Sequence, residues 1–269
     1  MKIIMPMAGS GKRFADEGYS EIKPIIQIGG KAMVAHACDS FPNNADSDIE
    51  FIFICNKEHI DTTNLGDVLK SVRSNSKIVS IAPDNGGPVT SVLLAEKEIP
   101  DDEEVIINYC DFAMEWDYDR FIDEMHAKKA DGGIPAFRGF QPAQFTGTKY
   151  AYLRLDNVGG SETKPAQGLR VLEIREKESF TNNKLSEFAS TGTYYFRTGA
   201  LMKKYFHKAV EFNLRAGPGS EFYASLPFNP MIKDGLRVFA HEVKKFICFG
   251  TPADVRHYEF WHDYFFGNK

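Results

Sequence analysis

Residues 1–14 read MKIIMPMAGSGKRF, and this stretch decides the fold class. The apolar run from Ile3 to Met7 is typical of a buried strand, and glycines follow it at once. Glycines after a parallel strand let backbone N–H groups approach phosphate oxygens in the crevice beyond the strand's carboxyl end. The stretch therefore predicts an α/β sheet with an anion-binding loop beside its first strand. The residues expected at this loop are Ala8, Gly9, Ser10, Gly11, Arg13 and Lys23.

Two better-known glycine loops do not fit the spacing. A P-loop has a glycine five residues before its Gly-Lys pair and Ser or Thr after it, where this chain has Pro6 and Arg13. A dinucleotide-binding fingerprint has a third glycine where Phe14 stands. The remaining alternative to a phosphate site is a plain glycine turn with solvated cations.

Short apolar runs alternate with amphipathic stretches along the chain. In the first half they predict strands over 3–7, 51–55, 78–81 and 105–109, and helices over 33–41, 59–72 and 90–99. After about residue 130 they predict strands over 134–137, 150–155, 169–174, 193–196 and 237–243, and helices over 200–214 and 252–265. We expect a Rossmann-like, doubly wound mixed sheet with no linker between the two halves.

Composition excludes several classes of protein. The 269 residues are 43% hydrophobic, which is enough for the core of one large domain. A net charge of −5 leaves no basic footprint for nucleic acid, and no apolar run approaches the length of a membrane span. The four cysteines form no Cys-x-x-Cys pair, so structural zinc and disulfides are not expected, and Cys38 and Cys55 should be buried. We expect a cytoplasmic protein that binds neither nucleic acid nor a membrane.

A carboxylate follows the strand that begins at Val105, because the segment VIINYCD ends at Asp111. This places Asp111 at the carboxyl edge of the sheet, beside the glycine loop. Mg²⁺ commonly uses one or two protein carboxylates together with phosphate oxygens and water, so a single Asp here suffices as its anchor. The alternative is that Asp111 caps a turn after the strand.

The segment from Gly9 to Arg13, followed by Lys23-Pro24, fits the pattern Gly-x-Gly-x-Arg with a later Lys-Pro. In this the chain resembles the sugar-phosphate nucleotidyltransferases, also called sugar-nucleotide pyrophosphorylases. The stretch from Gly29 to Met33 is similar to the family's Gly-Lys-Pro-Met turn, with alanine in place of proline. The resemblance implies the nucleotide-diphospho-sugar transferase type of fold, in one domain over 1–269. It also implies transfer of NMP from an NTP to a phosphorylated small acceptor, with Mg²⁺ as cofactor and pyrophosphate as product.

The resemblance assigns the nucleotide to residues 1–130. Arg13 and Lys23 would hold the NTP phosphates beside the glycine loop, and Asp111 would hold Mg²⁺. Gly86 and Gly87 occupy the place of the base-recognition loop, where backbone groups could approach a flat base edge. A turn without base contact is an equal alternative. Backbone recognition by a compact loop favours a pyrimidine, with CTP as the first choice.

The resemblance assigns the acceptor to residues 131–269. Lys177 would meet its phosphate, Glu176 its hydroxyl groups, and the backbone of Gly192 would line its pocket. A solvated Glu-Lys ion pair is the alternative for the first two. The acceptor stays open between a sugar 1-phosphate and another phosphomonoester, such as phosphocholine or a phosphorylated amino-acid-like compound. The family also implies a pathway to surface or capsular polysaccharide, and it often forms homo-oligomers.

The chain departs from the family at its second metal ligand. The family carries an Asp two residues before Gly-Thr-Pro, and here that residue is Cys248, a poor magnesium ligand. Asp111 with water, or another acid such as Asp254 or Glu176, would then hold the metal.

Two rival functions follow from these departures. A nucleotide-sugar-dependent glycosyltransferase would usually carry Asp-x-Asp, but the first Asp is replaced by Tyr109. The other rival is a nucleotide-binding regulator that has lost catalysis, in which Cys248 in place of the metal-binding Asp is the change that abolished activity.

Overall fold

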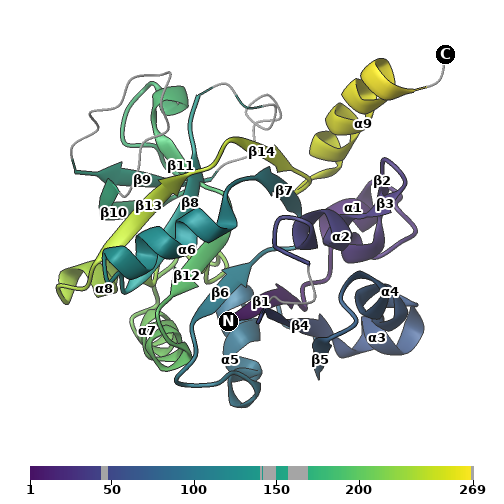
Figure 1. The fold of residues 1–269 in the computed structure, drawn as a ribbon. Coiled ribbons are helices and arrows are strands. Elements are labelled where there is room, and N and C mark those ends of the chain that lie inside the picture. Colours follow the sequence, from purple (N-terminus) through teal and green to yellow (C-terminus); the bar gives the residue numbers. More distant parts are fainter. Residues whose placement is uncertain (44–47, 140, 142–149, 157–168, 268–269) are drawn as a thin grey trace.

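The fold is known from a computed structural model, which describes residues 1–43, 48–139, 141, 150–156 and 169–267. In this part of the chain a mixed sheet of ten strands runs through the molecule, in the order β11-β9-β10-β13-β8-β12-β6-β1-β4-β5 (Figure 1). Its strands are β1 (Lys2–Met7), β4 (Glu50–Asn56), β5 (Ser76–Ile81), β6 (Val105–Asn108), β8 (Gly132–Phe137), β9 (Ala151–Leu155), β10 (Leu169–Glu176), β11 (Phe188–Ser190), β12 (Thr193–Phe196) and β13 (Val238–Glu242). Two short ribbons accompany it, formed by β2 (Gln27–Ile28) with β3 (Lys31–Ala32) and by β7 (Phe112–Glu115) with β14 (Lys245–Cys248).

The N-terminal strands are parallel and bring their carboxyl ends to one edge of the sheet. β1 lies between β4 and β6, and Ile3 pairs with Phe51 on one side and Ile106 on the other. The loop after β1 and the segment after β6 therefore leave the sheet side by side. This confirms the expectation that the glycine loop lies beside Asp111, the carboxylate that follows the strand beginning at Val105.

Strands from before and after residue 130 belong to the same sheet. β12 is antiparallel to both β6 and β8, and it thereby joins the parallel N-terminal strands to the mixed C-terminal ones. β13 is parallel to β8, and β10 is antiparallel to both β13 and β9. The expected Rossmann-like mixed sheet is confirmed, and β11 also pairs with β8.

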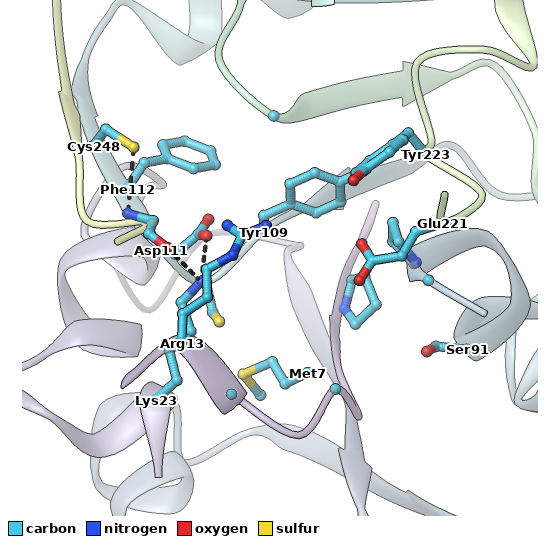
Figure 2. Close-up of a pocket in the computed structure, with 18 of the residues that line it drawn as sticks. Met7, Arg13, Lys23, Ser91, Tyr109, Asp111, Phe112, Glu221, Tyr223 and Cys248 are labelled. Carbon is cyan, nitrogen blue, oxygen red and sulfur yellow. Dashed lines mark hydrogen bonds and ion pairs between the residues drawn. The ribbon is translucent and has the colours of Figure 1, made fainter. Parts of the chain in front are cut away.

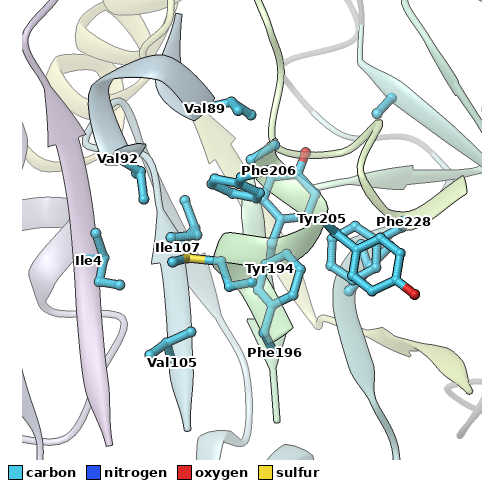
Figure 3. Close-up of a cluster of buried hydrophobic side chains, with 14 of the residues drawn as sticks. Ile4, Val89, Val92, Val105, Ile107, Tyr194, Phe196, Tyr205, Phe206 and Phe228 are labelled. Atoms are coloured by element: carbon cyan, nitrogen blue, oxygen red, sulfur yellow. The ribbon is translucent and has the colours of Figure 1, made fainter. Parts of the chain in front are cut away.

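Helices cover both faces of the sheet, because successive residues of each buried strand point to opposite sides. Ile4 faces a cluster with Val89, Val92, Phe206 and Phe228 (Figure 3), while Ile3 and Met5 face the other cluster. The helices are α1 (Lys12–Asp16), α2 (Met33–Cys38), α3 (Lys57–Thr62), α4 (Leu65–Val72), α5 (Pro88–Leu94), α6 (Tyr118–Ala127), α7 (Gly199–Glu211), α8 (Phe228–Lys233) and α9 (Pro252–Phe266).

Local capping explains where the expected helices differ from the structure. The helix expected over 59–72 is divided into α3 and α4, because the backbone of Thr63 is extended at the end of α3; its hydroxyl accepts a hydrogen bond from the Leu65 amide. The helix expected over 90–99 ends at Leu94 and continues as a 3-10 turn. Helices α1, α6 and α8, strand β11 and the two ribbons were not predicted, although the apolar residues of α6, Tyr118, Phe121, Ile122 and Met125, do follow a helical period.

Two expectations from composition can be compared with the structure. Cys38 and Cys55 are fully buried, as predicted, and burial raises the pKa of each thiol to about 12. Among the described residues, no helix combines the length and the apolar character needed to cross a membrane.

Candidate active site

A cavity of about 420 Å³ opens at the carboxyl edge of the sheet, where β1 and β6 end (Figure 2). It collects residues that lie far apart in the sequence, from the glycine loop to the segment after β14. The predicted site residues that line it are Ala8, Gly9, Ser10, Gly11, Arg13, Lys23, Gly87, Asp111, Glu176, Lys177 and Gly192. Gly86 is not part of its lining.

The glycine loop adopts a backbone that suits close approach by a ligand. Gly11 has φ +66° at the start of α1, a conformation that residues with a Cβ rarely adopt. A Cβ built on Gly9 would meet no protein atom within 4 Å, so this side of the loop faces open space. Gly11 also lies against Lys23, whose Cβ is 3.4 Å from the position of an added methyl group. The loop thus presents backbone and cations to the cavity with little side chain between.

Lys23 and Asp111 form an ion pair at the floor of the cavity. Lys23 Nζ lies 2.6 Å from Asp111 Oδ2 and 3.5 Å from the carbonyl oxygen of Gly250, and Arg13 stands on the same side (Figure 2). Burial alone lowers the pKa of Lys23, but the Asp111 carboxylate outweighs burial, so the pKa is raised overall. Lys23 is therefore protonated at neutral pH, and its side chain keeps 23% exposure toward the cavity.

The residues near Asp111 provide one carboxylate for a metal. Cys248 accepts a hydrogen bond from the Gly250 amide and donates one to Asp254, and burial raises the pKa of its thiol, so it is a neutral side chain. Asp254 Oδ2 accepts hydrogen bonds from the amide and hydroxyl of Thr251, as part of the capping box of α9. Within the described ranges, no three His, Cys, Asp or Glu side chains are grouped to hold a metal. Asp111 is the carboxylate here that could anchor Mg²⁺, with phosphate oxygens and water supplying the other ligands.

The Tyr150 hydroxyl is a further polar group at this end of the cavity. Tyr150 is 8% exposed and lies beside Cys248, yet its hydroxyl makes no well-aligned hydrogen bond within the described part of the chain. A buried hydroxyl without a partner costs free energy unless a ligand supplies one. Sequence reasoning considered Tyr150 only as part of a strand, because nothing in the sequence shows that its hydroxyl lacks a partner.

Asp84 organises the loop around Gly86 and Gly87, which was predicted as the base-recognition loop and keeps that name below. Its carboxylate accepts hydrogen bonds from the Gly86 amide and from the hydroxyls of Thr90 and Ser91, at 2.6 to 2.9 Å. The Gly86 carbonyl is also used, because it accepts a hydrogen bond from Phe222. Gly86 therefore acts as part of a turn. Of these two glycines it is Gly87, with φ +106°, that lines the cavity. An Asp two residues before a glycine is an Asx-turn signal that could have identified Asp84.

Glu176 and Lys177 line the cavity and are held by hydrogen bonds with side chains of the segment before α8. Ser225 Oγ donates a 2.6 Å hydrogen bond to Glu176 Oε2, and Lys177 Nζ donates to the Tyr223 hydroxyl. Lys177 has φ +64°, which is uncommon for a residue with a side chain. These contacts show that neither residue is simply a solvated surface charge.

Gly192 is constrained by its neighbours. Its carbonyl accepts a hydrogen bond from the Tyr109 amide, and its own amide donates to Ser190 Oγ. With φ +99°, and with Phe112 and Tyr109 about 3 Å from an added Cβ, the position requires glycine. Its backbone polar groups already have partners, so it shapes the cavity by its small size.

Replacing Glu176 with glutamine is expected to change how stability depends on pH. Burial raises the pKa of the Glu176 carboxyl, and the Ser225 hydrogen bond and Lys177 only partly oppose this. Below the unfolded pKa both states are protonated; as the pH rises above about 4.5, the unfolded chain ionises first and the folded state loses relative stability. The melting temperature of the wild type should therefore fall relative to Glu176→Gln as the pH rises through this range. A difference between the two that is constant with pH would contradict the assignment.

With the geometry established, comparison with known proteins identifies the family. The model of the family described as nucleotidyl transferase matches residues 1–217 of this chain. The chain belongs to the nucleotidyl transferase family. The resemblance seen in the glycine loop is thereby confirmed, and the protein is a nucleotidyltransferase. No curated protein sequence matches it significantly.

Solved structures show the same fold over nearly the whole nucleotidyltransferase. A nucleoside-diphosphate-sugar pyrophosphorylase from Vibrio cholerae RC9 has a TM-score of 0.71 at 19% identity, covering 96% of this chain and 99% of its own. A UDP-glucose pyrophosphorylase complexed with UDP-glucose has a TM-score of 0.70 at 14% identity, covering 98% of each chain. An inositol-1-phosphate CTP transferase from T. maritima has a TM-score of 0.65 at 13% identity, covering 97% of this chain and 96% of its own. At these identities the likeness concerns the fold.

Proposed function

We propose that this nucleotidyltransferase transfers the NMP part of an NTP to a phosphorylated small acceptor and releases pyrophosphate. The observation that carries the proposal is one cavity lined by cations from separate parts of the chain. Arg13 and Lys23 stand beside the glycine loop (Figure 2), and Lys177, which directly follows β10, donates a hydrogen bond to Tyr223 in the same lining. Such an arrangement suits two phosphate-bearing ligands that must meet end to end. Residues 1–130 would hold the nucleotide, and residues 131–269 the acceptor.

The chemistry requires positioning and charge neutralisation. A phosphate oxygen of the acceptor forms a new bond to the α-phosphorus of the NTP, and the bond from that phosphorus to the bridging oxygen of pyrophosphate breaks. The second pKa of a phosphomonoester is about 6, so the nucleophile is already anionic at neutral pH and needs no general base. Arg13, Lys23 and Lys177 offset the repulsion between the two ligands and hold them in line.

Asp111 is the residue that would hold Mg²⁺. The ion would supply positive charge to the phosphate oxygens of the NTP. Lys23 keeps the Asp111 carboxylate in place through its 2.6 Å contact. Cys248, as a neutral thiol, would leave this role to Asp111.

The base favoured by the cavity is cytosine. Glu221 lines the wall beside Gly87, and its carboxylate can accept hydrogen bonds but not donate them (Figure 2). Cytosine offers an amino group to such an acceptor, whereas uracil and thymine offer a carbonyl oxygen at the same position. This supports CTP among the pyrimidine nucleotides. The acceptor is a sugar 1-phosphate or a similar phosphomonoester, and we place the enzyme in the cytoplasm, in capsular or surface polysaccharide synthesis, as a homo-oligomer.

Nucleotide binding tests the proposal directly. The melting temperature is measured with ATP, GTP, CTP, UTP or dTTP, each with Mg²⁺. A ligand at 100 times its Kd adds about 2.7 kcal/mol of stability, which for this size corresponds to a shift of about 5–10 °C. We expect the largest shift with CTP. No shift with any nucleotide would overturn the proposal, and tight binding without turnover over a broad acceptor panel would favour a nucleotide-binding regulator.

Mg²⁺ without nucleotide is expected to leave the melting temperature unchanged. One carboxylate, already paired with Lys23, is too small a set of ligands to hold the ion without phosphate oxygens. Mg²⁺ should instead increase the shift that CTP produces, and chelation by EDTA should reverse that increase. If Mg²⁺ alone stabilised the protein as much as Mg²⁺ with CTP, the assignment of Asp111 as single anchor would be wrong.

A further inference from the structure

The segment Glu221–Ser225, which we call the strap, crosses the wall of the cavity between α7 and α8. It follows the part of the chain that the family model matches. Glu221 and Tyr223 line the cavity, and Tyr223 lies next to Tyr109 (Figure 2). The strap contacts both the base-recognition loop and the acceptor residues, and so it connects the two ends of the proposed site.

The backbone of the strap is bonded to the base-recognition loop. Phe222 N donates to Gly86 O at 2.8 Å, and Val89 N donates to Phe222 O at 3.2 Å. The approach is close, because a Cβ on Gly87 would lie 2.7 Å from Glu221 Cβ and 2.9 Å from Phe222 N. The loop and the strap therefore form one hydrogen-bonded unit, and a ligand that orders one also orders the other.

Side chains of the strap hold the acceptor residues. The Tyr223 hydroxyl accepts a hydrogen bond from Lys177, whose Nζ lies 4.5 Å from the centre of the same ring. Ser225 Oγ donates to Glu176 Oε2 at 2.6 Å. Phe222, Ala224 and Ser225 are buried, whereas Tyr223 is half-buried and Glu221 is exposed.

A third contact ties the strap to the strand that leads to Asp111. Ala224 N donates a 3.1 Å hydrogen bond to the hydroxyl of Tyr109, which lies two residues before Asp111 in the chain. The strap is thus bonded to the segment that leads to Asp111, to the base-recognition loop, and to Glu176 and Lys177.

We propose that the strap positions Glu176 and Lys177 in response to nucleotide binding, with Tyr223 and Ser225 as the positioning residues. This inference rests on the proposed function. A nucleotide that orders the base-recognition loop orders the strap, and the strap then restricts Lys177 before the acceptor arrives. The acceptor consequently binds more tightly to the nucleotide complex than to the free enzyme, since part of the ordering has already taken place.

Amide hydrogen exchange of the full chain, with and without CTP and Mg²⁺, tests this coupling. In the wild type we expect CTP to slow exchange about fivefold in peptides covering 84–90, 219–226 and 172–178. In the double variant Tyr223→Phe/Ser225→Ala, CTP should still protect the first two segments, because their backbone bonds remain. The protection that CTP adds to 172–178 should be reduced, because the two side-chain hydrogen bonds that join the strap to Lys177 and Glu176 are removed.

A matched control separates this effect from general loss of a tyrosine hydroxyl. Tyr205→Phe removes a 2.8 Å hydrogen bond to Asp234 outside the cavity, and it should retain the wild-type pattern. If the double variant fails to fold, the single variant Tyr223→Phe, which keeps the ring beneath Lys177, is used and should reduce protection of 172–178.

The outcomes distinguish the two proposals. CTP binding that leaves the strap unprotected in the wild type overturns the coupling while the proposed function stands. Equal protection of 172–178 in wild type and variant likewise overturns it. Failure of every nucleotide to bind overturns the proposed function, and the strap inference with it.

Discussion

Asp111→Asn is expected to lower kcat/KM by about 10³-fold, equivalent to about 4 kcal/mol of transition-state stabilisation. Asparagine has the same shape but lacks the charge that would hold Mg²⁺ on the phosphates. Lys23 can still donate a hydrogen bond to the side-chain amide oxygen of the asparagine. The 2.6 Å contact is therefore kept, although residue 111 no longer carries a charge. The loss should therefore appear in turnover, with the protein folded, as checked by steady-state kinetics and a melting curve.

Nucleotide binding without metal gives the control for this variant. The Asp111 carboxylate repels phosphate when Mg²⁺ is removed, so Asp111→Asn should bind CTP in EDTA at least as tightly as the wild type. A purely structural role would weaken binding with and without metal alike. Near-normal turnover of the variant would remove Asp111 from the mechanism.

Lys23→Met is expected to have the next largest effect, a loss of about 10²-fold to 10³-fold in kcat/KM. Methionine keeps the length and much of the volume of the side chain, but it removes a cation that Asp111 helps to hold in the protonated state against the opposing effect of burial. Unlike Asp111→Asn, this variant should also weaken CTP binding in EDTA, because Lys23 acts on the phosphates directly. Calorimetric Kd values for CTP with and without Mg²⁺ check this.

Lys31→Met is the matched control for this substitution. Lys31 lies in the same part of the chain and is paired with Asp39 on the surface, outside the cavity lining. It should leave the Kd for CTP and kcat/KM unchanged. If both methionine variants weaken CTP binding equally, the effect reflects net charge rather than a contact with the phosphates.

Much of the site could be predicted because parallel strands bring their carboxyl ends to one edge of the sheet, whatever their order. Ile3 to Met7 and the run before Asp111 both read as buried strands, and parallel strands end at one edge. The glycine loop and the carboxylate were therefore expected to meet, and the structure places Lys23 on Asp111. The buried state of Cys38 and Cys55 followed in the same way from the apolar runs that contain them.

Other features depend on contacts that no local pattern encodes. For Gly86 the sequence left base contact and a plain turn as equal alternatives, and the structure shows its amide and carbonyl bonded to Asp84 and Phe222. The carbonyl's partner comes from a distant segment, and the period of a strand or helix says nothing about such a pair. The orphan hydroxyl of Tyr150 is visible only when every neighbouring donor and acceptor has been placed.

The sequence by itself determined the mixed α/β sheet, the glycine loop after its first strand and the carboxylate at its edge, because hydrophobic period and glycine spacing act over a few residues. Only the tertiary structure decided that Glu176 and Lys177 are held by Ser225 and Tyr223. It also decided that the strap connects these residues to the base-recognition loop. These contacts arise where the chain closes back on itself, and their geometry depends on how the sheet and the helices pack.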